Sequence, residues 1–472
     1  MSRVGAGFAG IFELYRLRSR SLGYSTKVFE AEGDIGGVWW RNCYPGARVD
    51  SVVTVYEFSD EKVWRDWSWS EIYPGWKELR RYFQHVDEKL HVRKDIVFNR
   101  KVVSAKWNAD NDRWLVTSQD GFVVSARFFL LCVGNTSKIY ITDIPRLDRF
   151  RGACHHTARW PQLEEGIDLH GKRVAVIGTG ASGVQVIQNV GPCASSLTVY
   201  QRTPNIAFPM RQKSIDDDAS ATMKYDVYSL IFRRLKQTSE IPPHPVGAKR
   251  SSLEASYFDT FNLPNVDLID LAQDPIIEIT ANGILTADGH ERVFDVIIFA
   301  TGFDAMTGGI TQIDIEGTDG IFYLRQMGER YANVLGNDDR QIPQLVFHLW
   351  TRRPDRIFEW ANVHCEYFTV YFQNLLTTSW TKELQGEWIN ACIKDTMEKT
   401  LTRIEPLLEA EEEWQNEVSE SMSSRLLSTP TSVLMGKNIP GKVSEPLSYV
   451  GGIPKYIELC RKKMENGFEG FS

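Results

Sequence analysis

Short apolar runs that end at glycine recur along the chain, and they are typical of buried strands. Arg173–Ile177 is one such run, and another begins at Asp295 and closes on Thr301 and Gly302. The pattern predicts further strands over residues 96–107, 113–118, 122–134, 197–201 and 266–269.

Amphipathic stretches lie between and after these strands. Residues 76–91 predict a helix, because its apolar residues recur at helical spacing: Leu79, Tyr82, Phe83, Val86 and Leu90. Helices are also predicted near 383–398 and 404–418, ahead of a Gly/Pro-rich tail from Met435. Residues 206–248 are polar and match strands poorly, so we expect a short helical insertion there.

The chain opens on a glycine-rich motif. Gly5, Gly7 and Gly10 have the G-x-G-x-x-G spacing of a dinucleotide-binding turn, and Ile11 begins a plausible helix. The first glycine permits a tight turn, the second admits a pyrophosphate, and the third allows helix and strand to pack closely. Glu30 lies 20 residues after Gly10, where a ribose-binding carboxylate is expected. Only Met1–Val4 precede the motif, so we expect either a stunted first strand or an incomplete N-terminus.

A second motif of the same type follows the strand Arg173–Ile177. It comprises Gly178, Thr179, Gly180, Ala181, Ser182 and Gly183, and it opens a helix at Val184. The next strand ends at Arg202, in the place where the first unit has Glu30. A carboxylate favours a free ribose hydroxyl, whereas arginine accommodates a 2′-phosphate, so the first site suits FAD and the second NADPH. The sequence thus predicts an α/β fold with two Rossmann-like dinucleotide-binding domains and a reduced helical insertion.

Between the first motif and the long amphipathic helix lies a dense loop, Gly36–Asp50, rich in glycine and tryptophan. This composition fits a loop wrapped against an aromatic ligand. A rigid aromatic surface loop is the alternative interpretation.

Composition and charge exclude several classes of protein. With 42% hydrophobic and 24% charged residues and a net charge of −7, the chain is ordinary globular and shows no basic tract for nucleic acid. No apolar run approaches the ~20 residues that span a bilayer, and no signal peptide opens the chain. The seven cysteines form no CxxC pair, which argues against a zinc or other metal site and against a disulfide framework. We therefore expect a cytoplasmic enzyme.

The stretch Phe150–Pro161 connects the two glycine-rich units. Its neighbouring histidines, His155 and His156, and its Trp160-Pro161 ending are unusual for a simple connector. We interpret it as a packed crossover between domains.

These motifs together resemble the type I Baeyer–Villiger monooxygenases, which depend on FAD and NADPH. The resemblance rests on the two motifs in series, on Phe150-x-Gly152-x-x-x-His156-Thr157-x-x-Trp160-Pro161 between them, and on Ala300–Asp304 after them. It covers about residues 1–205, 242–330 and 383–472, and its details are similar to fungal members of secondary metabolism. It implies insertion of one oxygen atom of O2 next to a ketone carbonyl to give an ester or lactone, with a polyketide or terpenoid as substrate.

The resemblance also implies roles for individual residues. Glu30 would hold the FAD ribose, and five residues would contact the flavin cofactor: Val38, Trp39, Asp50, Tyr56 and Val102. The NADP pyrophosphate would lie on Thr179, Gly180, Ala181, Ser182, Gly183, Val184 and Gln185, and the 2′-phosphate near Gln201, Arg202 and Lys249. Arg48, Val49 and Asp50 would face the nicotinamide, and His156 would organise the linker without acid–base work.

The catalytic residues implied by the resemblance are Arg250 and Asp50, which would position the arginine. The activated oxygen must stay anionic to attack a ketone, so a fixed cation is required nearby. Arginine stays protonated and donates from a planar fork, which lysine does not reproduce. A buried carboxylate would orient that fork and offset its desolvation.

Besides the short first strand, three further features depart from the family pattern. The insertion after Arg202 is short, Val433 stands where the family usually has tryptophan, and residues 350–381 look foreign to the family. A gene-model or splicing error, or genuine decay, would explain the foreign segment.

We expect an FAD-binding part over 1–147, a linker over 148–167, an NADP-binding domain over 168–299, and a second FAD-binding part with the C-terminal region over 300–472. Two alternatives to the ketone oxygenase remain. An N- or S-oxygenating flavin monooxygenase would not need Arg250, and a catalytically impaired flavoprotein is suggested by the departures.

Overall fold

A computed structural model describes most of the chain. The described residues are 1–19, 25–162, 166–215, 252–305, 307–317, 379–401, 407–423, 449, 451 and 453–471. Lys249, Arg250, Val433, residues 350–378 and the predicted insertion from residue 216 onward lie outside them.

The first glycine-rich motif belongs to a four-stranded parallel sheet. Its order is β3-β2-β1-β7, with β1 (Ser2–Val4), β2 (Lys27–Phe29), β3 (Ile96–Val97) and β7 (Phe129–Leu131). Helix α1 (Phe8–Ser19) connects β1 to β2, as a dinucleotide-binding unit requires. Strand β1 has three residues, as short as predicted, and it pairs with neighbours on both sides.

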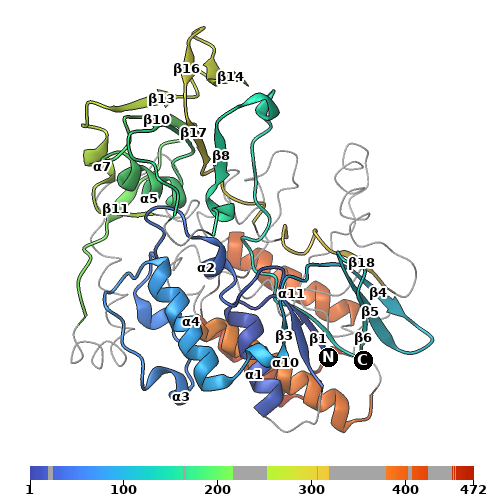
Figure 1. Cartoon of the computed structure of the whole chain (residues 1–472). Helices are drawn as coiled ribbons and strands as arrows, with labels where there is room; N and C mark the ends of the chain where they lie inside the picture. The colour runs from blue at the N-terminus through green and yellow to red at the C-terminus, as the bar shows by residue number, and fades with distance from the viewer. Residues whose placement is uncertain are drawn as a thin grey trace.

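The second motif belongs to a five-stranded parallel sheet (Figure 1). Its order is β13-β10-β9-β17-β8, with β13 (Val266–Asp270), β10 (Ser196–Gln201), β9 (Arg173–Ile177), β17 (Val296–Phe299) and β8 (Ala153–His156). Helix α5 (Ala181–Val190) follows β9. The α/β class with two such units is confirmed.

Strand β8 lies within the stretch Phe150–Pro161 that we interpreted as a crossover. It pairs in parallel with β17 along Ala153–His156, so part of the stretch is an edge strand of the second sheet. The crossover interpretation was therefore incomplete.

The described residues form three further sheets, of four, three and two strands. Strands β4 (Val102–Asn108), β5 (Arg113–Ser118) and β6 (Val123–Ala126) form an antiparallel meander, and β18 (Asp314–Glu316) pairs with β4. Strands β14 (Ile276–Ile279), β15 (Gly283–Thr286) and β16 (Glu291–Val293) form a second meander. Strand β11 (Ala207–Pro209) pairs in parallel with β12 (Ser252–Glu254).

Three sequence predictions are corrected by these strands. Residues 122–134 are not one strand, because β6 and β7 belong to different sheets, and residues 96–107 are divided in the same way between β3 and β4. The expectation that residues 206–248 avoid strands is wrong at its beginning, where β11 forms.

The long helices agree with the apolar pattern. Helix α4 (Trp76–Leu90) buries the predicted face, and α10 (Ser379–Glu398) and α11 (Leu408–Ser423) occupy the two predicted C-terminal regions. Helix α12 (Ile453–Glu465) was not predicted, because it lies in the tail that glycine and proline mark as irregular. Short helices are α2 (Val38–Arg41), α3 (Glu61–Trp64), α7 (Tyr257–Thr260) and the 3-10 turns η1 (Val53–Tyr56), η2 (Arg93–Asp95), η3 (Leu147–Arg149) and η4 (Thr157–Arg159).

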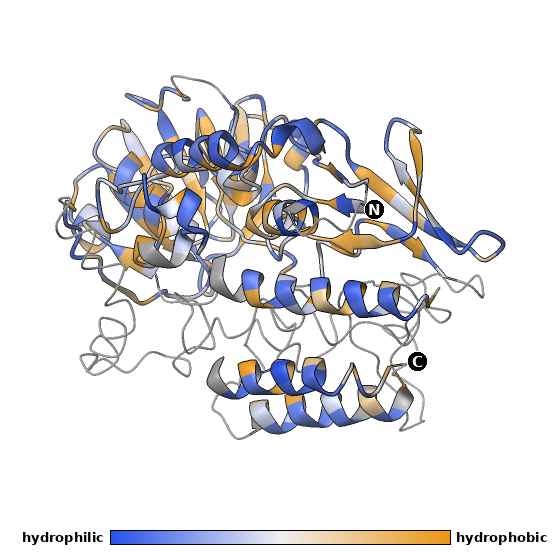
Figure 2. Ribbon diagram, turned by 90° about the horizontal axis from the view of Figure 1, so that it is seen from below, coloured by the Kyte–Doolittle hydropathy of each residue, from blue (hydrophilic) through white to orange (hydrophobic). Residues whose placement is uncertain are grey.

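The C-terminal helices complete the core of the first unit. Helix α10 packs on α1 although the two are far apart in sequence (Figure 1). Trp388 and Ile393 of α10 share one buried cluster with Phe129 of β7. Burying such a side chain stabilises the fold by about 1.5–3 kcal/mol. In Figure 2 the interior strands are largely hydrophobic, whereas the helices along the edge carry many hydrophilic residues.

Among the helices of the described residues, none combines the length and the apolar character needed to cross a membrane.

Candidate active site

A cavity of about 950 Å³ lies where the two parallel sheets bring their glycine-rich turns together. In the first sheet β1 lies between β2 and β7, and in the second sheet β9 lies between β10 and β17. The order of strands therefore reverses at the strand that precedes each motif. Such switch points, at the carboxyl ends of parallel strands, are where α/β sheets bind ligands.

The first motif leaves room for a ligand at one glycine only. A Cβ on Gly5 would meet the carbonyl oxygen of Cys132 at 2.3 Å, and one on Gly10 would meet the carbonyl oxygen of Gly5 at 1.8 Å. At Gly7 the nearest atom is the Cα of Gly37 at 3.7 Å, an ordinary contact. The protein itself therefore requires glycine at positions 5 and 10, whereas the space at Gly7 fits an approaching pyrophosphate.

Glu30 lies at the end of β2 and lines the cavity. Its Oε2 accepts a hydrogen bond from the amide of Ala6 at 2.6 Å, and its Oε1 accepts one from the amide of Glu32 at 2.9 Å. Burial raises the pKa of this carboxyl, and the two amides oppose the shift. The carboxylate thus fixes the motif turn while facing the place where a ribose is expected.

The loop Gly36–Asp50 forms one wall of the cavity. All five residues expected to contact the flavin cofactor line it, namely Val38, Trp39, Asp50, Tyr56 and Val102. Trp39 meets Tyr56 edge to face, with ring centroids 5.8 Å apart. Asp50 is only 2% exposed, and Arg48 also lines the cavity, whereas Val49 is fully buried and does not.

The second motif lies across the cavity. Ala181, Ser182 and Gln185 of α5 line it, while Gly183 and Val184 are buried behind them. A Cβ on Gly180 would meet no protein atom within 4 Å, so this position fits a pyrophosphate cradle.

Two of the three residues expected near the 2′-phosphate, Gln201 and Arg202, lie beside the second motif, and Lys249 is outside the described residues. Thr179 donates to the carbonyl of Thr203 at 3.2 Å and accepts from the Gln201 amide at 3.3 Å. Arg202 is exposed and follows β10 directly. Its guanidinium is therefore available to an anionic ligand.

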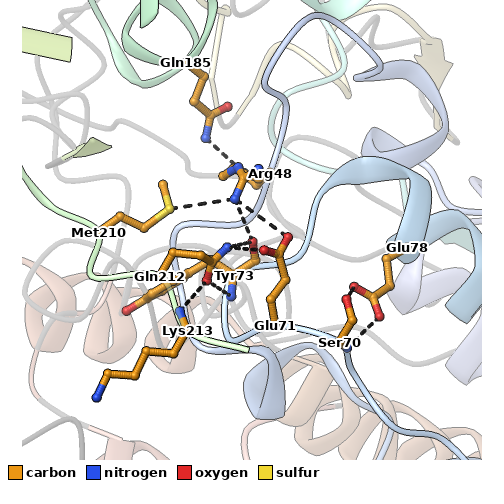
Figure 3. Close-up of polar contacts among 9 residues, drawn as sticks. All are labelled: Arg48, Ser70, Glu71, Tyr73, Glu78, Gln185, Met210, Gln212 and Lys213. Atoms are coloured by element: carbon orange, nitrogen blue, oxygen red, sulfur yellow. Dashed lines mark hydrogen bonds and ion pairs between the residues drawn. The ribbon is translucent and has the colours of Figure 1, made fainter. Parts of the chain in front are cut away.

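The two units touch through loop Gly36–Asp50 and helix α5. The Tyr44 hydroxyl lies 2.8 Å from Oε1 of Gln185 and 3.2 Å from Oγ of Ser182. Nε2 of Gln185 donates to the carbonyl oxygen of Arg48 at 3.0 Å (Figure 3). A ligand held at the start of α5 would therefore lie against the loop that faces the flavin site.

His156 is buried, and it contacts the linker and Phe303. It is 5% exposed, its Nδ1 accepts from the Ala158 amide at 3.1 Å, and its ring meets Phe303 edge to face at 5.9 Å. Burial lowers its pKa to about 4, so the imidazole is neutral near pH 7. These contacts suit the expected role in ordering the linker.

Comparison with known proteins identifies the family. The family model described as flavin-binding monooxygenase-like matches residues 1–211. Over 99% of the chain, the sequence is 33% identical to cyclopentanone 1,2-monooxygenase of Comamonas sp., of which 95% is covered. The chain belongs to the Baeyer–Villiger branch of the flavin-binding monooxygenases.

Other members of the family agree with this assignment. The FAD-binding monooxygenase acrE of Aspergillus aculeatus is 34% identical over 99% of the chain and 88% of that protein. The phenazine N-monooxygenase PhzNO1 of Lysobacter antibioticus is 29% identical over 99% of the chain and 96% of that protein. The crystal structure of OTEMO complexed with FAD and NADP superimposes with a TM-score of 0.85 and 28% identity, covering 100% of this chain and 98% of that one.

Several cavity residues were not predicted from the sequence. Arg41 donates from Nη1 to the carbonyl oxygen of Ser137 at 3.2 Å, and burial lowers its pKa against the opposing charges of Glu32 and Glu30. Arg159 also lines the cavity, from within the linker motif. Further lining residues come from connections after strands, including Asn99, Lys101, Gln119, Asp120 and Phe303. Arg41, Arg159 and Phe303 lay in stretches that the sequence had singled out, namely the loop Gly36–Asp50, the linker motif and Ala300–Asp304.

Asp50 and Arg250 are not brought together in the described part of the chain, because Arg250 and Lys249 lie outside it. Their pairing stays a prediction.

Proposed function

We propose that this chain is an FAD- and NADPH-dependent Baeyer–Villiger monooxygenase that inserts one atom of O2 next to a ketone carbonyl. The product would be an ester or a lactone. When bound, NADPH supplies hydride and FAD supplies the centre at which O2 is activated.

One observation carries the proposal. A single cavity is lined by Gly7 and Glu30 of the first motif and by Ser182 and Gln185 of the second. Two dinucleotides bound at these motifs would meet in the same cavity, as hydride transfer between them requires. The two glycine cradles and the complex of OTEMO with both cofactors support the same assignment.

We assign binding roles to the chain's own residues on this basis. Gly7 and Glu30 would hold the FAD pyrophosphate and ribose, while Trp39 and Tyr56 would pack against the flavin cofactor. Gly180 would admit the NADP pyrophosphate at the start of α5, and exposed Arg202 would bind the 2′-phosphate.

The catalytic roles of Arg250 and Asp50 are part of the proposal. Asp50 is buried in the cavity wall, where a carboxylate favours a cationic partner such as arginine. Arg250 would hold negative charge on the oxygen that attacks the ketone.

The Arg250→Ala variant tests this assignment. We expect NADPH still to bleach the flavin, because the binding motifs are intact, and ester formation to fall by at least about a hundredfold. Mass spectrometry with 18O2 would show one labelled oxygen in the wild-type ester and none from the variant. Ester formation by Arg250→Ala at the wild-type rate would remove Arg250 from the mechanism.

A second candidate function is oxygenation of a ring nitrogen. The likeness to PhzNO1, a phenazine N-monooxygenase, is the observation that favours it. Parallel incubations with a ketone panel and with phenazine, each with NADPH, separate the two by the product formed. The third reading, an impaired flavoprotein, predicts that purified protein binds FAD but consumes no NADPH in either incubation.

We further propose that the substrate is a polyketide- or terpenoid-type ketone and that the enzyme works in the cytoplasm. The likeness to a fungal FAD-binding monooxygenase supports the first, and the free thiols of the described cysteines fit the second. Fractionation of the producing cells tests the location.

A further inference from the structure

The segment Met210–Ile215 crosses from the second unit onto the first. The amide of Ile72 donates to the carbonyl of Lys213 at 3.0 Å, and the amide of Ile215 donates to the carbonyl of Ser70 at 3.0 Å. Between them, Glu71 and Ser214 form an antiparallel bridge. We call Met210–Ile215 the stem, because it leads from β11 toward residues 216–251.

The start of the stem, at Met210, lies beside strand β12. Strand β12 begins at Ser252, two residues after Arg250, and it pairs with β11. The amide of Met210 also donates to the carbonyl of Glu254 at 2.8 Å. The stem therefore precedes residues 216–251, which contain Lys249 and Arg250, and it is hydrogen-bonded to the strand that follows them.

Gln212 makes the most specific contacts of the stem (Figure 3). Its Oε1 accepts from the Tyr73 amide at 3.1 Å, and its Nε2 donates to the Tyr73 carbonyl at 2.8 Å. Nε2 also donates to Oε2 of Glu71 at 2.7 Å. One carboxamide thus satisfies both polar groups of a peptide residue and a carboxylate.

Arg48 contacts the same residues from the flavin side. Its Nη1 lies 3.4 Å from the Tyr73 carbonyl oxygen, 3.7 Å from Oε1 of Glu71 and 3.9 Å from Sδ of Met210. Its own carbonyl oxygen accepts from Gln185 of α5. Arg48 therefore connects the start of α5 to the surface on which the stem lies.

The receiving surface is held in place independently of the stem. Glu78 of α4 accepts from both the amide and the hydroxyl of Ser70, at 2.8 and 2.7 Å (Figure 3). A surface fixed in this way loses little conformational entropy when the stem docks.

We propose that Gln212, Glu71 and Arg48 form a latch that docks the stem on the flavin-site unit and couples this docking to NADP(H) binding at α5. The coupling rests on the proposed function, whereas the docking does not. The three are positioning residues. Because linkage is reciprocal, a docked stem strengthens dinucleotide binding by the same factor by which the dinucleotide favours docking.

Amide hydrogen exchange tests the docking in the FAD-loaded protein without substrate. Gln212→Ala removes the carboxamide, and we expect exchange at the Ile72 and Ile215 amides to accelerate about fivefold or more. Lys213→Ala is the matched control, because its side chain is exposed and points away from the contacts in Figure 3. It should exchange like the wild type.

Calorimetric titration with NADP+ tests the coupling. We expect Gln212→Ala to bind NADP+ about fivefold or more weakly than Lys213→Ala does. Equal affinities, or equal exchange rates, in these two variants would overturn the latch. A wild-type protein that binds no NADP+ at all would contradict the proposed function. The amide exchange rates would still test the docking, because they are measured without NADP+.

A double variant that swaps the amide and the carboxylate of Gln212 and Glu71 distinguishes the loss of this contact from a general loss of folding. Gln212→Glu places two carboxylates together and should release the stem. Adding Glu71→Gln places an amide donor at position 71 beside the new carboxylate at position 212. The double variant should therefore exchange its amides more slowly and bind NADP+ more tightly than Gln212→Glu alone. No recovery in the double variant would count against a direct pairing of these two side chains.

Discussion

Single glycines in the second motif serve two different physical purposes. A Cβ on Gly183 would meet the carbonyl oxygen of Gly178 at 2.3 Å, whereas one on Gly180 meets no protein atom within 4 Å. Gly183 is needed by the fold, whereas Gly180 has room beside it for a ligand, although the sequence motif presents them alike.

This difference predicts opposite results for two matched variants. Gly183→Ala should destabilise folding by about 1–3 kcal/mol, because helix and strand must separate. Gly180→Ala should leave the melting temperature unchanged and weaken NADP+ binding about tenfold or more. Thermal unfolding and calorimetric titration of both variants check this. Unchanged NADP+ affinity in Gly180→Ala would remove the pyrophosphate from this cradle.

His156 predicts a pH dependence of stability. Burial lowers its pKa to about 4 in the folded protein, below the ~6.5 of an unfolded chain. The unfolded state therefore binds more protons in this window, so stability is full above pH 6.5 and falls as pH falls toward 4. Between pH 7 and 5 the loss from this group is about 2 kcal/mol.

The His156→Asn variant isolates that contribution. Asparagine can accept the Ala158 amide bond without titrating. Denaturant unfolding at pH 7 and pH 5 should show a smaller loss for the variant than for the wild type. Equal losses would mean that His156 is protonated as easily in the folded protein as in the unfolded one.

Among the elements, helix α4 orders the loop Gly36–Asp50, which forms one wall of the cavity. The Arg80 guanidinium lies between two indole rings, 4.3 Å from the centroid of Trp40 and 4.4 Å from that of Trp76. Its Nη2 donates to the Trp40 carbonyl and to Gln162 of the linker, and its Nε lies 3.4 Å from the Trp39 carbonyl. One side chain thus joins α4, α2 and the linker.

Arg80→Lys should break this junction, because an ammonium does not reproduce a planar stack with forked donors. We expect a loss of about 1–2 kcal/mol in stability and faster release of FAD, since Trp39 lines the cavity. Arg81→Lys is the matched control, because Arg81 is the exposed neighbour on the same helix. Thermal unfolding and the fluorescence of released flavin measure both effects. If Arg80→Lys and Arg81→Lys had the same stability and the same rate of FAD release, Arg80 would not order the loop Gly36–Asp50.

Elements with a strong local pattern were predictable, and those decided by tertiary contacts were not. Helix α4 and strand β9 show their buried faces directly in the order of apolar residues. Strand β8 has alanine, cysteine and two histidines and is stabilised by pairing with β17 at an edge, which local sequence does not reveal. Residues 122–134 are apolar at both ends, so nothing local shows that the chain changes sheet between β6 and β7.

At the scale of the whole molecule, the cavity depends on how the two units sit together. Each glycine motif was predictable from spacing, as was Glu30 by its distance from Gly10, and Asp50 was predictable through the family resemblance. Lys101 and Gln119 reach the cavity only because separate sheets converge on it, so no local pattern marks them. The loop Gly36–Asp50 contacts α5 of the second unit, and Gly46 lies at this contact.

Gly46 therefore gives the sharpest prediction about the assembled molecule. Its φ is +79°, and a Cβ there would meet Nδ2 of Asn189 at 2.2 Å and the carbonyl oxygen of Gln185 at 2.6 Å, both on α5. Gly46→Ala should push the loop off α5 and, because hydride transfer tolerates little displacement, slow anaerobic flavin bleaching by NADPH about a hundredfold. FAD content should be retained, because the first motif is untouched.

Gly121→Ala separates this steric effect from backbone strain. Gly121 has a similar φ of +82°, but a Cβ there would meet no atom within 4 Å. Both variants bear the cost of a left-handed alanine, about 1 kcal/mol, and only Gly46→Ala adds a clash between the units. Stopped-flow bleaching should therefore be near the wild-type rate in Gly121→Ala. If the two variants bleached equally fast, the contact between loop Gly36–Asp50 and α5 would not set the distance between the cofactors.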